Sequence, residues 1–454
     1  MSAVLPPEPF DVEADVLVIG AGAAGMVAAL AAVEAGRAVL VLERDPVPAG
    51  STALSAGLIP AAGTRWQRAA GVADDPARFA ADIQAKAQGE NDPALVAALV
   101  AAAGPTLEWL ADRHGLPFTL VDDFDYPGHS RRRMHGLPSR SGAELVDRLR
   151  AACEGAGVDI LCAAPVDALY ADTRVRGARV ARPDGRHERI GCRRLVLACN
   201  GFGANRAMVA RHMPAVADAL YFGHAGNRGE AMVWGAALGA AIRHPGAYQG
   251  HGNVAHPHGV LITWATITEG GFQANRDGAR FWDESQGYSE AARAVLAQPG
   301  GEAVTVFDAR IAAVARQFAD FRAAEAAGAG RRAPAPAALA AAFGLPEGPF
   351  AASFAAFEAA KAGAPDAFGR PLAGRAPLAA PLCGVRVTGA LFHTQGGLAT
   401  DGAARVLRPD GTAISGLRAA GGAACGVSGS GDAGYLSGNG LLAAVTLGRA
   451  AGAA

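Results

Sequence analysis

The sequence predicts an α/β fold in which a parallel sheet with helices on its faces is interrupted by a second domain of α+β type. Residues 15–43 read as strand, glycine turn, Ala-rich helix and strand, the order of a βαβ unit. The apolar run RRLVLACNGFG at 193–203 indicates another buried parallel strand that ends in a glycine turn. From about 246 the pattern changes to a Trp- and Thr-rich strand region followed by Ala-rich helices. Residues 386–454 then return to strands, glycine turns and a final helix.

These changes set the expected domain bounds. We expect residues 1–245 and 386–454 to form one α/β domain, and residues 246–385 to form a domain inserted into it. No repeat of fixed period is visible.

Composition limits the partners that such a protein has. The 454 residues contain 41 Lys and Arg against 42 Asp and Glu, so no net field attracts nucleic acid or an anionic membrane. The N-terminal segment lacks the basic start and apolar core of a signal peptide, and no run of about 18 uncharged apolar residues predicts a membrane span. We therefore expect a cytoplasmic protein whose partner is a small-molecule substrate.

The cysteines do not indicate a metal centre or a disulfide framework. They are scattered, with no C-x-x-C pair and no His at a metal-ligand spacing: Cys153, Cys162, Cys192, Cys199, Cys383 and Cys425. Zinc, iron-sulfur clusters and c-type haem are therefore not expected, and we interpret these side chains as small apolar residues in a reducing compartment.

A glycine turn in the first βαβ unit predicts a Rossmann-type dinucleotide site. Gly20, Gly22 and Gly25 form G-x-G-x-x-G between a strand and a helix, and Glu43 ends the next strand. In this context the first glycine allows the tight turn, the second lets the backbone approach a pyrophosphate, and the third lets helix and strand pack closely. Glu43 is placed to accept hydrogen bonds from the adenosine ribose hydroxyls.

The motif alone does not distinguish NAD from FAD, and two further segments favour FAD. GSTALSAG at 50–57 follows Glu43 at the distance where flavoproteins place hydroxyl groups near the pyrophosphate and the flavin. AAGG at 419–422 resembles a segment that binds the ribityl chain of a flavin.

The chain resembles the fumarate reductase and succinate dehydrogenase flavoprotein superfamily from residue 15 to residue 449. The matching landmarks, in order, are VIGAGAAGMVAALAA, the Ser51-Thr52 pair, ACNGFGAN, QANRDGARFWDES, HTQGGL and SGNGLL. The resemblance implies an FAD-binding domain interrupted by a capping domain, with the substrate held between the cap and the flavin. Covalent members of the family carry a His after the first βαβ unit, and GSTALS has none, so we expect noncovalent FAD.

The motif and the resemblance together assign the expected cofactor-binding residues. The resemblance implies adenine contacts near Val166, flavin contacts from Ala56, Gly57 and Thr394, and backbone contacts to the flavin ring carbonyl from the helix start at 440–441. The full expected set is Gly20, Gly22, Ala24, Gly25, Glu43, Arg44, Ser51, Thr52, Ala56, Gly57, Val166, Asn200, Gly201, Thr394, Gly422, Asn439, Gly440 and Leu441.

Several substrate-site positions differ from those of the dicarboxylate reductases in this superfamily. Thr-Glu becomes Thr263-Trp264, the proton-donating Arg becomes Tyr288, the His before T-x-G-G becomes Phe392, and the second carboxylate-binding Arg becomes Tyr435. One family His persists as His251. A site that has tyrosines in place of two arginines has lost its anion clamp, which disfavours fumarate and succinate.

The remaining pattern resembles the 3-ketosteroid dehydrogenase branch, in which two tyrosines perform the chemistry. FWDESQGY and GYLSGNGL supply both. Desaturation next to a ketone needs a base for the α proton, a donor to the enolate oxygen and a flavin N5 that takes the β hydride. We assign Tyr288 as the base, which requires a lowered pKa, and Tyr435 as the oxyanion donor. Substrate contacts are expected from His251, Trp264, Phe392 and Tyr126, the last of which is otherwise an ordinary loop residue.

Three functions remain open at this point. The first is FAD-dependent desaturation of a cyclic or otherwise activated ketone, or the reverse reduction of an enone, with a separate electron partner such as a quinone, a carrier protein or oxygen. The second is oxidation or reduction of an unsaturated mono- or tricarboxylate held by the histidines and by the basic turn RRRMH at 131–135, which is otherwise a structural turn. The third is a noncatalytic FAD-binding protein.

Overall fold

The computed structural model describes residues 3–182 and 184–453, which form two compact units. Unit 1 comprises Met1–His212, Gly223–Tyr248 and His393–Ala454, and unit 2 comprises Met213–Phe222 and Gln249–Phe392. The main segment of unit 2 runs from 249 to 392, whereas the expected insertion runs from 246 to 385. Unit 2 also includes 213–222. That short segment belongs to unit 2 because β11 (Leu220–Tyr221) pairs in parallel with β18 (Leu382–Thr394), with Leu220 opposite Ala390.

The sheet of unit 1 is built around the first βαβ unit. β2 (Val12–Ile19) lies between β3 (Val39–Leu42) and β10 (His187–Leu197), and both pairings are parallel, as the continuous apolar strands predict. β21 (Ala413–Ala419) adds to β10 in parallel, with Leu195 opposite Leu417. The C-terminal segment therefore returns to the sheet that the N-terminal segment began.

Shorter strands complete unit 1. The large sheet also contains β1 (Ala3–Leu5), β7 (Asp159–Leu161), β8 (Val166–Ala171), β9 (Val175–Ala181) and β20 (Arg405–Leu407). Two small sheets consist of β4 (Ile59–Pro60), β5 (Thr119–Leu120) and β6 (Met134–Gly136), and of β12 (Ile242–Arg243) with β19 (Gly397–Leu398).

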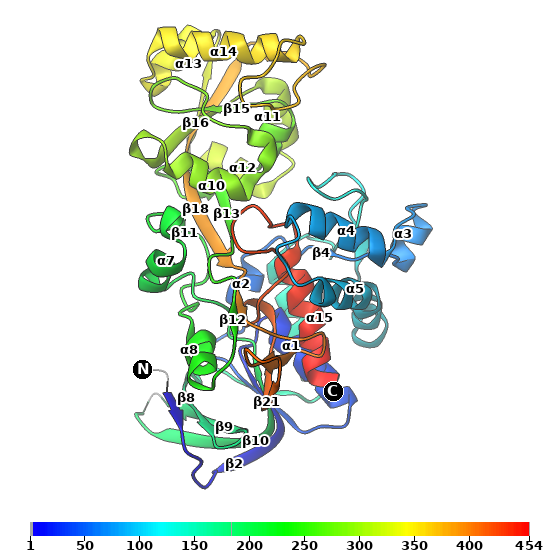
Figure 1. Ribbon diagram of the computed structural model, residues 1–454. Coiled ribbons are helices and arrows are strands. Elements are labelled where there is room, and N and C mark those ends of the chain that lie inside the picture. Colours follow the sequence, from blue (N-terminus) through cyan, green and yellow to red (C-terminus); the bar gives the residue numbers. More distant parts are fainter. Residues whose placement is uncertain (1–2, 183, 454) are drawn as a thin grey trace. The chain divides into compact units, whose positions relative to one another are not determined.

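Two helices pack together beside this sheet (Figure 1). α1 (Ala23–Glu34) follows the glycine turn, and α15 (Asn439–Ala453) is the last helix of the chain. They approach so closely that a Cβ added at Gly448 would lie 2.5 Å from the carbonyl oxygen of Ala24. The other helices of unit 1 are α2 (Gly50–Ala53), α3 (Arg65–Ala69), α4 (Pro76–Lys86), α5 (Pro93–His114), α6 (Gly142–Gly155), α7 (Arg206–His212) and α8 (Glu230–Ala237).

Among the described residues, α5 alone is long and apolar enough to cross a membrane, judged by length and composition. Of its most apolar stretch, 56% is buried inside the protein, and Leu95, Leu99 and Leu107 belong to the unit 1 core. The length and apolar composition of α5 are equally consistent with a helix of the protein core and with a membrane span.

Unit 2 is a second sheet with helices of its own. The strand order is β14 (Val260–Leu261), β13 (Tyr248–Ala255), β18, β16 (Glu302–Asp308) and β15 (Phe272–Ala274), with β11 and β17 (Gly330–Ala333) also paired to β18. Every position of β16 is buried. Because both faces of this strand are covered, its sequence EAVTVFD does not show the strict alternation of apolar and polar residues that a half-exposed strand has. The helices are α9 (Ala265–Thr268), α10 (Tyr288–Leu296), α11 (Ala309–Ala315), α12 (Ala319–Ala326), α13 (Pro336–Phe343) and α14 (Glu347–Lys361).

Candidate active site

The glycine turn after β2 has the close contacts that a dinucleotide-binding turn requires. Gly20 has φ +104°, a conformation that disfavours a side chain, and a Cβ there would lie 2.5 Å from the carbonyl oxygen of Ala198, directly after the neighbouring strand β10. A Cβ at Gly25 would lie 1.8 Å from the carbonyl oxygen of Gly20. Gly22 is the N-cap of α1 and has no side-chain cap, and Ala24 lies in the first turn, so N–H groups of that turn are left for a ligand.

Glu43 is held at this turn by two backbone donors. The N–H of Ala21 donates to Glu43 Oε2 at 2.7 Å, and the N–H of Asp45 donates to Oε1 at 2.9 Å. The side chain is nearly buried, and each carboxylate oxygen keeps a further lone pair. A ribose with two hydroxyl groups matches this carboxylate, whereas a phosphate would be repelled by it.

Ser51 and Thr52 keep their hydroxyl protons for a ligand. Thr52 Oγ1 accepts from the N–H of Ala23 at 3.1 Å. Ser51 Oγ accepts from Asn200 Nδ2 at 2.9 Å and from Asn227 Nδ2 at 2.8 Å. Because a hydroxyl has one donor and two lone pairs, these contacts leave both protons to point elsewhere, as phosphate or ribityl oxygens require.

Two glycines pack closely against Asn200 and Thr394. A Cβ at Gly201 would lie 1.8 Å from Thr394 Oγ1, and one at Gly422 would lie 2.2 Å from Asn200 Oδ1. Thr394 Oγ1 is buried and has no hydrogen-bond partner among the described residues. A buried hydroxyl without a partner is costly, so this oxygen indicates a polar group of a ligand at this place.

The start of α15 carries a chain of polar side chains. Asn439 Nδ2 donates to Ser428 Oγ at 3.1 Å, Ser428 donates to Gln395 Oε1 at 2.7 Å, and Gln395 Nε2 lies 3.0 Å from His393 Nδ1. Burial lowers the pKa of His393 to about 4, so this imidazole is neutral at neutral pH. Asn439 Oδ1 is a second buried oxygen without a partner in the described part of the chain.

The other expected cofactor residues lie beside these groups. The segment before Val166 contacts the end of β3, because the N–H of Ala164 donates to the carbonyl of Glu43 at 2.8 Å. Arg44 donates to the carbonyl of Gly226 at 2.8 Å. Gly57 has φ +66° and lies against Ser141, next to the exposed Ala56. Leu441 packs against the unit 1 core.

Tyr435 is a buried phenol in the loop that precedes α15. Burial raises its pKa, and the backbone N–H groups of Gly438 and Gly440, which lie at its oxygen, lower it by less. The ring meets His393 edge-on, with centroids 5.6 Å apart. The side chain therefore stays protonated at neutral pH and is able to donate a hydrogen bond. The N–H of Gly440, which we expected at the flavin carbonyl, interacts with this phenol in the structure.

Unit 2 contains a stack of aromatic rings that includes the other expected substrate residues. His251 lies nearly parallel to Tyr288, with centroids 5.0 Å apart, and to Phe392 at 5.6 Å. Phe222 continues the stack on Phe392 at 5.0 Å, and Trp264 meets His251 edge-on at 5.7 Å. Burial lowers the pKa of His251 to about 3. This imidazole is uncharged at neutral pH and therefore adds no positive charge to the stack.

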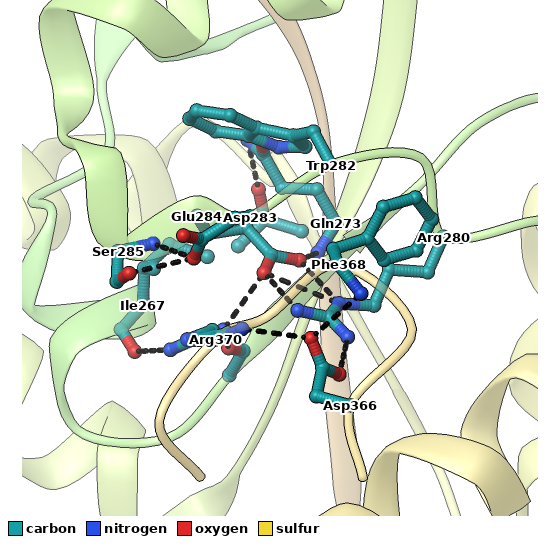
Figure 2. Close-up of polar contacts among 12 residues, drawn as sticks. Ile267, Gln273, Arg280, Trp282, Asp283, Glu284, Ser285, Asp366, Phe368 and Arg370 are labelled. Carbon is teal, nitrogen blue, oxygen red and sulfur yellow. Dashed lines mark hydrogen bonds and ion pairs between the residues drawn. The ribbon is translucent and has the colours of Figure 1, made fainter.

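A buried ionic network fixes the segment that leads to Tyr288 (Figure 2). Arg280 pairs with Asp366 and donates to Glu284 at 2.7 Å. Arg370 donates to Glu284 at 3.1 Å and to the carbonyl of Ile267 at 2.7 Å. Since Ile267 is in α9, next to Trp264, this network holds both flanks of the aromatic stack.

Removing Arg370 tests this supporting role. Arg370→Leu is expected to lower the free energy of unfolding by about 3 kcal/mol, because it leaves buried Glu284 short of a partner and removes a donor from the carbonyls of Ile267 and Gly271. Arg375→Leu is a matched control, because Arg375 is exposed and its guanidinium donates, within the described part of the chain, only to the carbonyl of Thr268 at 3.1 Å; it should change stability by less than about 0.5 kcal/mol. Urea titration measures both, and equal losses would contradict the account.

Two expected features of unit 1 have a structural role in this conformation. Tyr126 packs on Phe124, with centroids 4.9 Å apart, and against the cluster of Leu58, Val121 and Met134. Its loop lies over the segment that follows Tyr435, where His129 Nε2 is 2.9 Å from the carbonyl of Ser437.

The basic turn at 131–135 is also committed to internal contacts. The guanidinium of Arg133 is fully buried and donates to both oxygens of Asp74 at 3.0 Å, and it also pairs with Asp82. Arg132 pairs with Asp125, and Arg131 donates to the carbonyls of Ser130 and Ala73. These contacts favour the structural interpretation of the turn over a carboxylate clamp.

The polar groups of unit 1 thus fit FAD, with a ribose acceptor at Glu43, hydroxyl donors at 51–52, and unpartnered oxygens at Thr394 and Asn439. A family model described as FAD binding domain matches residues 15–441. The chain belongs to the FAD binding domain family. The expected cofactor, the resemblance to the fumarate reductase flavoproteins and the interrupted α/β fold are confirmed, and the protein is an FAD-dependent oxidoreductase.

Three proteins show how far the likeness extends. The probable fumarate reductase Ifc3 of Shewanella frigidimarina (strain NCIMB 400) is 32% identical over 444 residues, which cover 96% of this flavoprotein and 74% of that relative. The open conformation of a flavocytochrome c3 fumarate reductase matches with TM-score 0.82 at 30% identity, over 98% of this chain and 78% of that one. The 3-ketosteroid-Δ4-(5α)-dehydrogenase of Rhodococcus jostii RHA1, in complex with 4-androstene-3,17-dione, matches with TM-score 0.79 at 25% identity, over 98% and 97%.

Several residues of the flavoprotein's candidate site were not expected from the sequence. Asn227 and Asn200 both donate hydrogen bonds to Ser51 Oγ, and Phe222 extends the aromatic stack. Gln395 and Ser428 link Asn439 to His393. The sequence contains a feature from which Asn227 could have been predicted as a site residue, because it lies in the Gly-rich turn GNRGE directly before α8. No such feature marks Phe222, because the ring on which it stacks, Phe392, is 170 positions away in the chain.

Proposed function

We propose that this flavoprotein desaturates a cyclic or otherwise activated ketone next to its carbonyl, or reduces the corresponding enone. The observation that carries the proposal is the uncharged aromatic stack of His251, Tyr288 and Phe392, in which Tyr288 takes the place of the proton-donating Arg of the dicarboxylate reductases that the sequence resembles. The R. jostii dehydrogenase, which matches over nearly its whole length, has a steroid ketone bound and supports this substrate class.

Tyr435 is proposed to donate a hydrogen bond to the substrate's carbonyl oxygen. Its raised pKa keeps the phenol protonated, which is the state that a donor to a developing oxyanion needs. Its loop is fixed from two sides, since Ser430 is bonded to Glu90 and the Tyr248 hydroxyl donates to Asp432 at 3.3 Å. A donor held in this way does not need to reorganise when charge develops on the oxygen.

Tyr288 is proposed to exchange the α proton. In the desaturating direction its phenolate takes the proton, and in the reducing direction the neutral phenol returns it. The rings of His251 and Trp264 lie beside it. Bound FAD supplies the two-electron acceptor or donor for the β carbon. A separate carrier, such as a quinone, a carrier protein or oxygen, is proposed to exchange electrons with the flavin.

The second candidate is reduction of an unsaturated carboxylate. The relation to the probable fumarate reductase of S. frigidimarina supports it. The arginines expected to hold such an acid are however bonded to Asp74, Asp82, Asp125 and backbone carbonyls. Of the residues expected to hold an acid, the histidines are then the ones that remain.

A single-turnover experiment tests the two candidates against each other. Enzyme whose FAD has been reduced with dithionite and freed of excess reductant is mixed anaerobically with cyclohex-2-enone, 4-androstene-3,17-dione, fumarate or urocanate. Reoxidation of the flavin by an enone and not by either acid is expected. Reoxidation of the flavin by fumarate or urocanate, and by neither enone, would contradict the proposal and indicate a carboxylate reductase.

A further inference from the structure

One peptide group in the loop before α15 is bound at both of its ends. The carbonyl oxygen of Ser437 lies 2.9 Å from His129 Nε2. The N–H of the same peptide belongs to Gly438, and it lies at the phenol oxygen of Tyr435. Because a peptide is planar, its carbonyl and its N–H do not turn independently. This single group therefore connects the imidazole to the phenol.

The hydrogen bond between His129 and Ser437 has one possible direction. A carbonyl oxygen only accepts, so Nε2 carries the proton and donates it. The other ring nitrogen, Nδ1, lies 3.4 Å from Arg133 Nη1, and a guanidinium only donates. Burial lowers the pKa of His129 to about 4, which agrees with a neutral ring that carries one proton.

A buried ionic network holds the imidazole in place. The guanidinium of Arg133 donates to both oxygens of Asp74 at 3.0 Å and pairs with Asp82. It also lies over the ring of Phe79 at 4.6 Å, and this ring packs on His129 with centroids 6.0 Å apart. The buried arginine of the basic turn thus fixes both the place and the tautomer of the histidine.

The peptide affects how strongly the phenol of Tyr435 donates. An N–H directed at the phenol oxygen stabilises negative charge there and so makes the hydroxyl a stronger hydrogen-bond donor. A donor to the carbonyl oxygen of the same peptide polarises the peptide and strengthens its N–H in turn. Burial raises the pKa of Tyr435, and the N–H groups of Gly438 and Gly440 oppose that rise.

We propose that His129 is a positioning residue for Tyr435: by donating to the Ser437 carbonyl, it holds the N–H of that peptide at the phenol oxygen and strengthens the hydrogen bond that the phenol gives to the substrate. This inference rests on the proposed function of Tyr435 as the donor to the substrate's carbonyl oxygen. Since His129 acts through the phenol, its contribution to the rate should require the phenol hydroxyl.

Three variants separate the hydrogen bond from the packing of the imidazole. His129→Phe keeps a ring against Phe79 and removes the donor, and His129→Gln places an amide N–H near the position of Nε2. His212→Phe is the matched control, because His212 also packs on a phenylalanine, Phe202, with centroids 5.6 Å apart. FAD content and melting temperature show whether each variant is folded, and His129→Leu replaces the phenylalanine variant if that variant is not.

A spectroscopic measurement on the oxidised holoenzyme tests the positioning without substrate. The protein is labelled with ¹³C at Cζ of its tyrosines, and the resonance of Tyr435 is the one missing from Tyr435→Phe. It is expected to move in His129→Phe, to return towards its original position in His129→Gln and to stay in place in His212→Phe. An unmoved resonance in His129→Phe would overturn the inference.

A double-mutant cycle tests the effect on the reaction. Holoenzyme reduced as above is mixed with cyclohex-2-enone or 4-androstene-3,17-dione at saturation, and the rate of flavin reoxidation is followed. His129→Phe should lower this rate about tenfold, and His129→Gln should recover part of the loss. In a Tyr435→Phe background the same change should lower the rate by less than about twofold, because the hydroxyl on which the peptide acts is gone.

Structural damage would give a different result in this cycle, because it lowers the rate equally in both backgrounds. An equal loss, or an unchanged rate in His129→Phe, would therefore overturn the inference. If neither enone reoxidises the flavin of the unaltered enzyme while the Tyr435 resonance moves as expected, the proposed function alone is contradicted.

Discussion

Tyr288→Phe is expected to lower kcat about a thousandfold while the enzyme keeps its full complement of FAD. The phenylalanine ring preserves the stack on His251 and the contact with Trp264, so the change removes only the hydroxyl that exchanges the α proton. Steady-state turnover with an artificial electron acceptor or donor measures the loss. Substrate affinity should change no more than a few fold, because the group removed acts on the reacting carbon.

Tyr170→Phe is the matched control for this prediction. Tyr170 is a buried tyrosine of β8 that packs edge-on against Phe10, with centroids 5.7 Å apart, and has no proposed part in the reaction. Its kcat should stay within about twofold of the unaltered enzyme's. Turnover near the normal rate in Tyr288→Phe would remove Tyr288 from the mechanism. An equal loss in both variants would indicate damage to the fold.

Gly25→Ala is expected to weaken FAD binding about a hundredfold, which corresponds to roughly 3 kcal/mol. The added methyl group would lie 1.8 Å from the carbonyl oxygen of Gly20 and 3.2 Å from the side chain of Val18. Helix α1 must then move away from β2, and with it the N–H groups that face the pyrophosphate. Fluorescence titration of the apoprotein with FAD measures the change.

The same substitution at Gly155 separates this effect from helix propensity. Gly155 ends α6, and a Cβ there meets no atom within 4 Å. Gly155→Ala should therefore leave FAD affinity unchanged and slightly raise stability. If Gly25→Ala bound FAD as tightly as Gly155→Ala, the close approach at the glycine turn would not be a requirement of the site.

Local patterns predicted most of the FAD-binding unit. The strand, turn and helix at 15–43 were expected because alternation, glycine spacing and apolar runs each act over a few residues, and the structure has β2, α1 and β3 there. The final helix near NGLLAAVTLGRAAG was expected on the same ground and is α15. In the inserted unit the short strand β17 was missed, because its pairing with β18 is a contact across about 50 residues and leaves no local period.

The site was less predictable, because its contacts join segments that are far apart in the chain. The roles of Tyr288 and Tyr435 came from the resemblance, and the structure adds their surroundings without testing those roles. Arg133 shows most clearly what sequence patterns do not predict. Three successive arginines gave no indication that the third would be buried between Asp74 and Asp82, since those partners lie more than 50 positions earlier. Charge patterns in sequence predict solvated surfaces, and a buried pair depends on tertiary structure.

The most direct test of the central claim, that a ketone and not an acid is the substrate, is an anaerobic titration of the oxidised holoenzyme. Cyclic ketones, steroids and saturated carboxylic acids are added in turn while the absorbance band of the oxidised flavin is followed. Loss of that band on addition of a ketone, and of no acid, is the predicted result. Loss of the band with acids alone would contradict the account and assign the protein to the carboxylate branch of its family.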